Sequence, residues 1–417
     1  MNFYSAYYKK QANYDQISQL KDKFDNLDLN ADGALNVDEL ANIFSGQTMT
    51  EQEKELLMLG VDGDNDNYLT YLEFTPTFVE FDIDQNAEIS GDEYDLAKKR
   101  FAELGKQMAI NEQYNILNSI TSTNTEKAQA RHNIDVFNAE RNIIYGELDV
   151  KKKAILISDK ELKAQEIQDF IDTNTLLEFD EVRKTKEITT LNAEKDILLL
   201  EKAISQNKLN LEAINLALIN KNYEKANETN PALIIAIKNA LAILEQEKIK
   251  YENDFNASER NLELHYNQIK IDDKESLLTK FFIPEFMKDN ARIELEFLYD
   301  EKQLTAQRLD LSLRVSALSD TRAQILTKIK EYNQSVDAVE KALLQQEINQ
   351  LKENEATQKL EATLANKQVE LLDKKIQLKA VIPKSDQKPF DEVRTTLETE
   401  IATLETQIAA LESQLGL

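Results

Sequence analysis

The stretch DLNADGALNVDE, residues 28–39, alternates oxygen-bearing side chains with spacer residues and ends in glutamate. The same twelve-residue pattern recurs at residues 62–73 (DGDNDNYLTYLE) and at residues 82–93 (DIDQNAEISGDE). Each stretch begins with Asp, carries oxygen side chains at its positions 1, 3, 5 and 9, and ends in Glu. A hard cation such as Ca²⁺ takes about six to eight oxygen ligands at about 2.3–2.6 Å, and this spacing wraps a short chain around one ion. The stretches, here named loops one, two and three, therefore predict cation sites near the N-terminus.

Each loop offers six candidate ligand positions. Positions 1, 3 and 5 supply side-chain oxygens, position 7 a backbone carbonyl, position 9 an oxygen that binds directly or through water, and position 12 a bidentate carboxylate. We expect up to three Ca²⁺ ions. The candidate ligands are Asp28, Asn30, Asp32, Ala34, Asn36 and Glu39 in loop one, Asp62, Asp64, Asp66, Tyr68, Thr70 and Glu73 in loop two, and Asp82, Asp84, Asn86, Glu88, Ser90 and Glu93 in loop three.

Residues 15–104, about a quarter of the chain, resemble the EF-hand family, the calmodulin-like helix–loop–helix calcium binders. Besides the ligand pattern, position 8 is apolar in every loop (Leu35, Leu69 and Ile89), and apolar residues flank the loops at helical spacing. The resemblance implies an EF-hand domain in which the position-8 residues lie in short paired strands between neighbouring loops.

Loop three departs from the family pattern in two ways. Position 6 requires a left-handed backbone, which Gly33 adopts freely and Asn67 tolerates, whereas Ala87 costs about 1 kcal/mol there. We therefore expect the third site to be the weakest. Loops one and two start 34 residues apart, but loops two and three only 20 apart, with Pro76 near the start of the helix between them. Whether loop three pairs with another chain, closes on loop two or stands alone is left open.

The composition of the 417-residue chain limits its partners. The net charge is −26, and residues 1–104 hold 22 acidic and 8 basic residues, so the acid excess is densest around the loops. No basic stripe is present to neutralise phosphates, so we expect no nucleic acid partner. There is no Cys, and we expect neither a conventional signal peptide nor a transmembrane segment. The default expectation is a cytoplasmic protein, with signal-independent export or particle assembly left open.

The rest of the chain predicts long helices. Glu, Lys, Leu, Ile and Ala dominate, and the whole sequence has only 8 Gly and 5 Pro. We expect an all-α protein: an aromatic N-terminal segment at 1–14, the EF-hand domain at 15–104, coiled-coil helices at 105–382, a linker at 383–389 and a C-terminal coiled-coil helix at 390–417. Breaks are expected near 121–125, where Thr123 and Glu126 form a capping box, and near 146, 229–231 and 284.

Heptad repeats underlie the coiled-coil prediction. Apolar residues recur at a mean spacing of about 3.5 residues within 197–218, 234–269, 325–343 and 401–415. Asn207 and His265 occupy core positions in the first two repeats and are either register-setting residues or tolerated imperfections. The repeats fit an antiparallel hairpin as well as a parallel bundle of several chains, so strand direction and oligomeric state stay open.

Catalytic motifs are missing from the sequence. The two histidines, His132 and His265, lie far apart in helical sequence, and no glycine-rich phosphate loop or nucleophile motif is present. We therefore predict no enzymatic activity.

Three functions compete on this sequence. The first is an acidic structural or scaffolding protein, in which calcium sites stabilise the end or a junction of an elongated coiled-coil assembly formed with itself or with a protein partner. The alternative is a calcium-responsive sensor or adaptor that docks a partner through the EF-hand domain, although the domain is poor in Met. A calcium buffer is less favoured, because it has no need of some 300 residues of rod. The length of the rod favours the structural role.

Overall fold

The computed structural model describes residues 14–44, 47–64, 66–174, 177–381 and 388–417. The expectation of an all-α chain is confirmed, since the described residues form long helices and a single pair of two-residue strands. The chain divides into two compact units, Met1–Leu216 and Ala217–Leu417, and helix α8 (Glu178–Asn227) crosses the boundary. The aromatic segment predicted at 1–14 and the linker predicted at 383–389 fall almost entirely outside the described residues.

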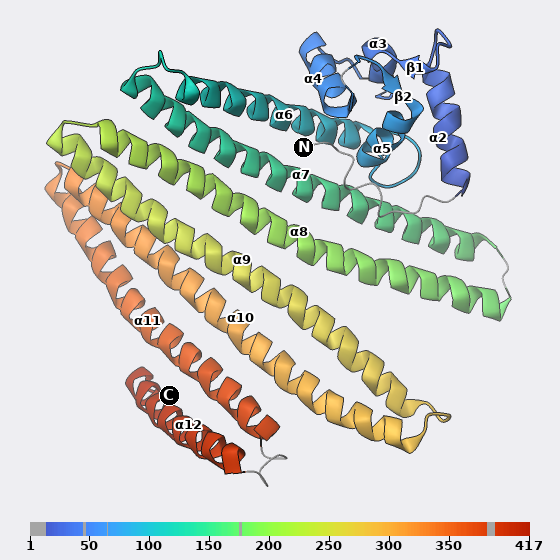
Figure 1. Cartoon of the computed structure of the whole chain (residues 1–417). Coiled ribbons are helices and arrows are strands. Elements are labelled where there is room, and N and C mark those ends of the chain that lie inside the picture. Colours follow the sequence, from blue (N-terminus) through green and yellow to red (C-terminus); the bar gives the residue numbers. More distant parts are fainter. Residues whose placement is uncertain (1–13, 45–46, 65, 175–176, 382–387) are drawn as a thin grey trace. The chain divides into compact units, whose positions relative to one another are not determined.

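Short helices and the three loops form the start of the first unit (Figure 1). Their aromatic side chains build the core: the rings of Phe24 and Phe74 lie 5.4 Å apart, and those of Phe44 and Tyr94 lie 5.0 Å apart. These rings come from the apolar positions that flank the loops, so burying them brings the helices together. The elements are α2 (Tyr14–Leu27), β1 (Ala34–Leu35), α3 (Val37–Ala41), α4 (Glu51–Val61), β2 (Leu69–Thr70), α5 (Tyr71–Phe81) and α6 (Gly91–Asn118).

Loops one and two lie side by side through their strands. β1 and β2 pair antiparallel, with Leu35 opposite Leu69, and both leucines are fully buried. Ile89, the equivalent residue of loop three, is buried in the same core. Within the described ranges it belongs to no strand. Loop three is therefore the unpaired member of the three.

Helix α6 leads directly from loop three into a helical hairpin with α7 (Asn124–Thr173). The turn lies where the capping box predicts it: the Glu126 N–H donates to Thr123 Oγ1 over 3.2 Å, and the Thr123 N–H donates to Glu126 Oε2 over 2.7 Å. The expected break near residue 146 is wrong, because α7 continues through Gly146. An isolated glycine costs a helix only about 1 kcal/mol. Here it also leaves room for α8, since a Cβ at this position would lie 3.2 Å from Leu209 Cβ.

The second unit contains four long helices that follow one another in antiparallel contact (Figure 1). They are α9 (Pro231–Thr279), α10 (Glu285–Gln334), α11 (Ala338–Val381) and α12 (Lys388–Leu415). Interhelical ion pairs accompany the apolar contacts: Lys250 pairs with Asp320 at 2.8 Å, and Arg322 pairs with Glu355 at 2.8 Å. Within one chain the neighbouring helices therefore run antiparallel. Of the two arrangements that the heptad repeats allow, these pairs adopt the antiparallel hairpin.

The structure has two interruptions between helices that the sequence does not predict. One lies between the end of α7 at Thr173 and the start of α8 at Glu178, and the other is Ser335–Asp337 between α10 and α11. The heptad repeat expected to continue over 325–343 is interrupted there, and Val336 is 100% exposed. The Val339 N–H donates to Asp337 Oδ1 over 2.8 Å, so a short polar cap starts α11 without Gly or Pro. None of the described helices is long and apolar enough to cross a membrane.

Candidate metal centre

The first aspartate of each loop holds the loop backbone in a tight turn. Its carboxylate accepts from the N–H groups at positions 5 and 6. Asp82 accepts from Asn86 over 3.0 Å and from Ala87 over 3.1 Å. Asp28 accepts from Asp32 (3.2 Å) and Gly33 (2.9 Å), and Asp62 accepts from Asp66 (3.3 Å) and Asn67 (2.8 Å). All three loops therefore curl around their first carboxylate in the same way.

The glutamate at position 12 closes each loop. One carboxylate oxygen accepts from the N–H at position 2, near the loop entrance, and the other accepts from the N–H at position 9. In loop three Glu93, fully buried, accepts from Ile83 over 2.6 Å and from Ser90 over 2.8 Å. The same bonds run from Leu29 (3.1 Å) and Asn36 (3.0 Å) to Glu39, and from Gly63 (3.0 Å) and Thr70 (3.0 Å) to Glu73.

The residues at positions 5 and 7 complete the turn. The side-chain oxygen at position 5 accepts from the N–H at position 7, over 3.0 Å between Asp32 and Ala34, 2.8 Å between Asp66 and Tyr68, and 2.7 Å between Asn86 and Glu88. At position 3 the side-chain oxygens of Asn30, Asp64 and Asp84 accept from the N–H of position 5, over 2.8, 3.3 and 3.1 Å. Each loop thus brings its predicted ligand residues into one short turn.

Position 6 is left-handed in all three loops, as the sequence predicts. The φ angles are +86° at Gly33, +67° at Asn67 and +65° at Ala87. Ala87 carries the cost of a Cβ in this conformation. Its carbonyl oxygen accepts from Lys23 Nζ of helix α2, a contact that the sequence does not reveal.

Carboxylates converge in two of the loops. Oxygens of Asp62, Asp64 and Asp66 lie within 4.8 Å of one another, and so do those of Asp82, Asp84 and Glu93. Burial, with Glu93 and Asp84 as further causes, raises the pKa of Asp82 to about 6. Burial and the neighbouring Asp66 and Glu73 raise the pKa of Asp64. Close like charges disfavour ionisation, so a bound cation would stabilise both clusters. Loop one holds two amides, Asn30 and Asn36, among its candidate ligands.

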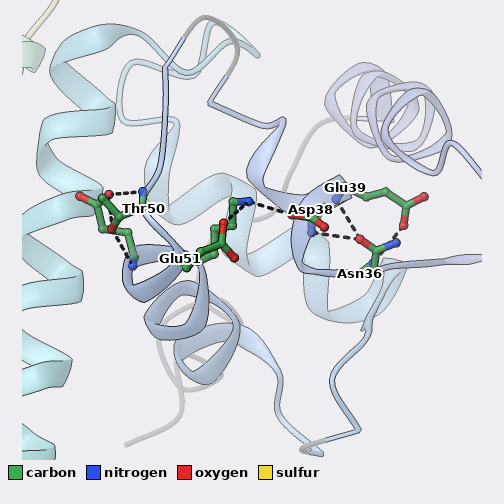
Figure 2. A network of polar contacts seen from close by, with 7 residues as sticks. Asn36, Asp38, Glu39, Thr50 and Glu51 are labelled. Carbon is green, nitrogen blue, oxygen red and sulfur yellow. Dashed lines mark hydrogen bonds and ion pairs between the residues drawn. The ribbon is translucent and has the colours of Figure 1, made fainter.

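The residues at position 9 also cap the helices that leave the loops. Asn36 Oδ1 accepts from the N–H groups of Asp38 (3.0 Å) and Glu39 (3.1 Å) at the start of α3 (Figure 2). Ser90 Oγ accepts from the Glu93 N–H over 3.3 Å, and Thr70 Oγ1 donates to Glu73 Oε2 over 2.8 Å. The same polar atoms therefore fix both the loop and the following helix.

A polar network not predicted from the sequence joins the first two helix–loop–helix units. Lys54 Nζ of α4 donates to Asp38 Oδ1 over 2.8 Å and to Glu51 Oε1 over 2.9 Å (Figure 2). These hydrogen bonds raise the pKa of Lys54. Beside it, the Thr50–Glu53 capping box starts α4, and its Thr-x-x-Glu pattern is readable in the sequence.

Loop three also contacts helix α7, which sequence reasoning missed. Ile83, at loop position 2, forms an apolar cluster with Leu96 of α6 and Ile155 of α7. Further along the hairpin, Glu103 is 3% exposed and its carboxylate accepts from Arg100 (2.6 Å), from Arg141 (2.6 and 2.9 Å) and from the Tyr145 hydroxyl (2.7 Å). Contacts between residues some 40 to 70 positions apart leave no local pattern, so only the fold reveals them.

Comparison with known proteins gives no match: no family model, no curated protein and no solved structure matches the chain.

Proposed function

We propose that loops one, two and three are EF-hand calcium sites, and that the protein is a calcium-stabilised structural component. The observation that carries this proposal is that all three loops are closed by the same set of hydrogen bonds. In each, the first Asp binds the N–H groups of positions 5 and 6, and the last Glu binds those of positions 2 and 9. In loop three, carboxylate oxygens from both ends of the loop, those of Asp82, Asp84 and Glu93, lie within 4.8 Å of one another, which supports a cation site there.

Calcium suits these loops better than magnesium. Mg²⁺ requires near-ideal octahedral geometry at about 2.0–2.1 Å and keeps several waters, whereas Ca²⁺ accepts irregular sets of about six to eight oxygens, including a bidentate glutamate. Loop two carries four carboxylates among the residues expected to bind through their side chains, while loops one and three carry three each, because Glu88 is expected to bind through its backbone carbonyl. With Ala87 strained in loop three, we expect loop two to bind most tightly and loop three least tightly.

The structural role is supported by the way the loops connect to the hairpin. Helix α6 begins one residue after Ser90 of loop three and continues without a break for 28 residues along α7. Calcium at loop three would therefore fix the first helix of the hairpin to the preceding domain.

The test is calcium titration of the full chain by calorimetry, with sedimentation in calcium and in chelator. A triple variant, Glu39→Gln, Glu73→Gln and Glu93→Gln, is the control, because each change removes one carboxylate charge and keeps the side-chain shape. The structural role predicts tight binding and an unchanged sedimentation coefficient at micromolar free calcium. Absence of binding heat from the wild-type chain would contradict the calcium sites.

A calcium-responsive adaptor is the second candidate, and one observation favours it. A groove of about 600 Å³ lies beside loop two, lined by Met58, Leu59 and Tyr68 together with polar loop residues. Leu59 is 49% and Tyr68 46% exposed, so an apolar side chain of a partner has a surface to contact. A large calcium-dependent change in sedimentation or helix content in the micromolar range would favour this function over the structural one.

A further inference from the structure

Loop three lacks the strand pairing that joins loops one and two, and helix α7 lies against it instead. Ile83 is 8% exposed, and the two residues that cover it, Leu96 of α6 and Ile155 of α7, are 7% and 9% exposed. Leu148 and Leu156 of α7 pack around this cluster. The second residue of the loop is therefore buried by a helix that follows it by some 70 residues.

Ion pairs hold α7 in place beside the loop. Lys151 Nζ lies 2.8 Å from Asp95 Oδ2 and 3.9 Å from Asp92 Oδ1, at loop position 11. One turn further along α6, Lys99 pairs with Glu147. These contacts flank the apolar cluster and fix where α7 lies along α6.

The buried residue and the closing glutamate are directly connected. The Ile83 N–H donates to Glu93 Oε1 over 2.6 Å, and the Asp84 N–H reaches the same oxygen at 3.4 Å. A shift of the Ile83 side chain would therefore move the backbone that orients Glu93. In loops one and two the equivalent position is occupied by Leu29, which is 74% exposed, and by Gly63, which has no side chain. Only loop three has an apolar anchor at this point.

We infer that Ile155 of helix α7 is a positioning residue for loop three, which uses α7 in place of a partner loop. Cation binding at loop three and docking of α7 on α6 then stabilise each other, because a coupling between two binding events is reciprocal. This inference rests on the proposed calcium function of the same loop.

The test isolates loop three within the full chain. Glu39→Gln with Glu73→Gln disables loops one and two, and calcium affinity is then measured by calorimetry with Ile155→Ala added. The expected result is a loss of about tenfold in calcium affinity, within the usual range of coupling between sites. The matched control is Ile157→Ala: Ile157 lies on the same helix and is 8% exposed, but it is not part of the Ile83 cluster. It should leave the affinity unchanged.

The outcomes separate the two claims. Equal affinities of the Ile155→Ala and Ile157→Ala proteins would overturn the role of α7 and leave the calcium site intact. No calcium heat from the Glu39→Gln, Glu73→Gln protein would remove the site in loop three itself, and the inference with it. Loss of affinity only in the Ile155→Ala protein, with helix content kept, supports both.

Hydrogen exchange tests the same coupling in the wild-type chain. This measurement does not require that a protein with a substituted core residue folds. Calcium should slow amide exchange at residues 148–156 of α7 at least tenfold more than at residues 160–170. Glu93→Gln should abolish this protection, and Glu39→Gln should leave it in place. Protection that survives Glu93→Gln would contradict coupling through loop three.

Discussion

At position 6, loop three differs from loop one by a single methyl group. Ala87 and Gly33 occupy equivalent left-handed positions, with φ angles of +65° and +86°. A Cβ added at Gly33 would meet no atom within 4 Å, so the difference between the two residues there is backbone strain and not a steric clash.

Ala87→Gly should therefore raise the free energy of unfolding of the first unit by up to about 1 kcal/mol, and Gly33→Ala should lower it by a similar amount. Denaturant unfolding in chelator, followed by circular dichroism, measures both changes. Opposite signs are the expected result, and a destabilised Ala87→Gly protein would contradict the strain at this position.

The burial of Asp82 predicts that the stability of loop three depends on pH. Because burial raises its pKa to about 6, the Asp82 contribution to stability in chelator is greatest below its unfolded-state value of about 3.8 and is lost as the pH rises through about 6. Calcium requires the ionised carboxylate, so its affinity must change in the opposite direction and fall on acidification.

In the Glu39→Gln, Glu73→Gln protein only the site in loop three is intact. We expect its calcium affinity to decrease by about tenfold between about pH 7 and pH 5, because one proton competes with the ion. Calorimetry at the two pH values checks this. The protein that retains only loop one is the comparison, and an equal decrease in both would exclude a special role for Asp82.

At the scale of elements, Glu103 joins helices α6 and α7. It is 3% exposed and accepts from two arginines and a tyrosine, so removing its charge leaves the guanidinium groups of Arg100 and Arg141 without their shared carboxylate. Glu103→Gln should lower the free energy of unfolding by about 3 kcal/mol.

Glu140→Gln is the matched control for Glu103. Its ion pair with Lys106 spans the same two helices at 2.6 Å, but the two side chains are 32% and 35% exposed, so its loss should cost at most about 1 kcal/mol. Thermal unfolding of both variants tests the difference, and equal costs would show that burial does not strengthen the Glu103 network.

The predictability of these elements follows from the range of the interactions that fix them. The turn of each loop, its left-handed position 6 and the capping box at Thr123 depend on residues within about twelve positions, and the sequence predicts them. The turn at Ser335–Asp337 was not predicted, because it contains neither Gly nor Pro. The side chains of Ser335 and Asp337 form its hydrogen bonds instead. The contacts of Ile83 with Ile155 and of Glu103 with Arg141 join distant residues, and no local pattern contains them.

The core positions of α9 show the same limit. The heptad repeat expected over 234–269 puts His265 at a core position, but the structure buries Asn267 and Ile271, and Ile269, the last residue of the repeat, is 37% exposed. A straight helix with about 3.6 residues per turn drifts relative to a strict seven-residue repeat, so a repeat extended over several heptads turns away from its partner.

For the whole molecule, calcium should act on one unit only. All candidate ligands lie within Met1–Leu216, so chelation should lower the melting temperature of that unit and leave that of Ala217–Leu417 unchanged. When free calcium is at about one hundred times the dissociation constant of a site, binding at that site adds about 2.7 kcal/mol to the free energy of unfolding. Scanning calorimetry of the full chain in calcium and in chelator measures this, and a shift of every transition would contradict it.

The unbroken helix α6 also has a mechanical consequence. Its 28 residues span about 40 Å from loop three to the turn before α7. A rigid rod of this length is a lever: a tilt of about 10° where it leaves the loop displaces its far end by about 7 Å. An angular change too small to alter the candidate ligands of loop three would thus become a movement larger than one helical turn, about 5.4 Å, at the tip of the hairpin.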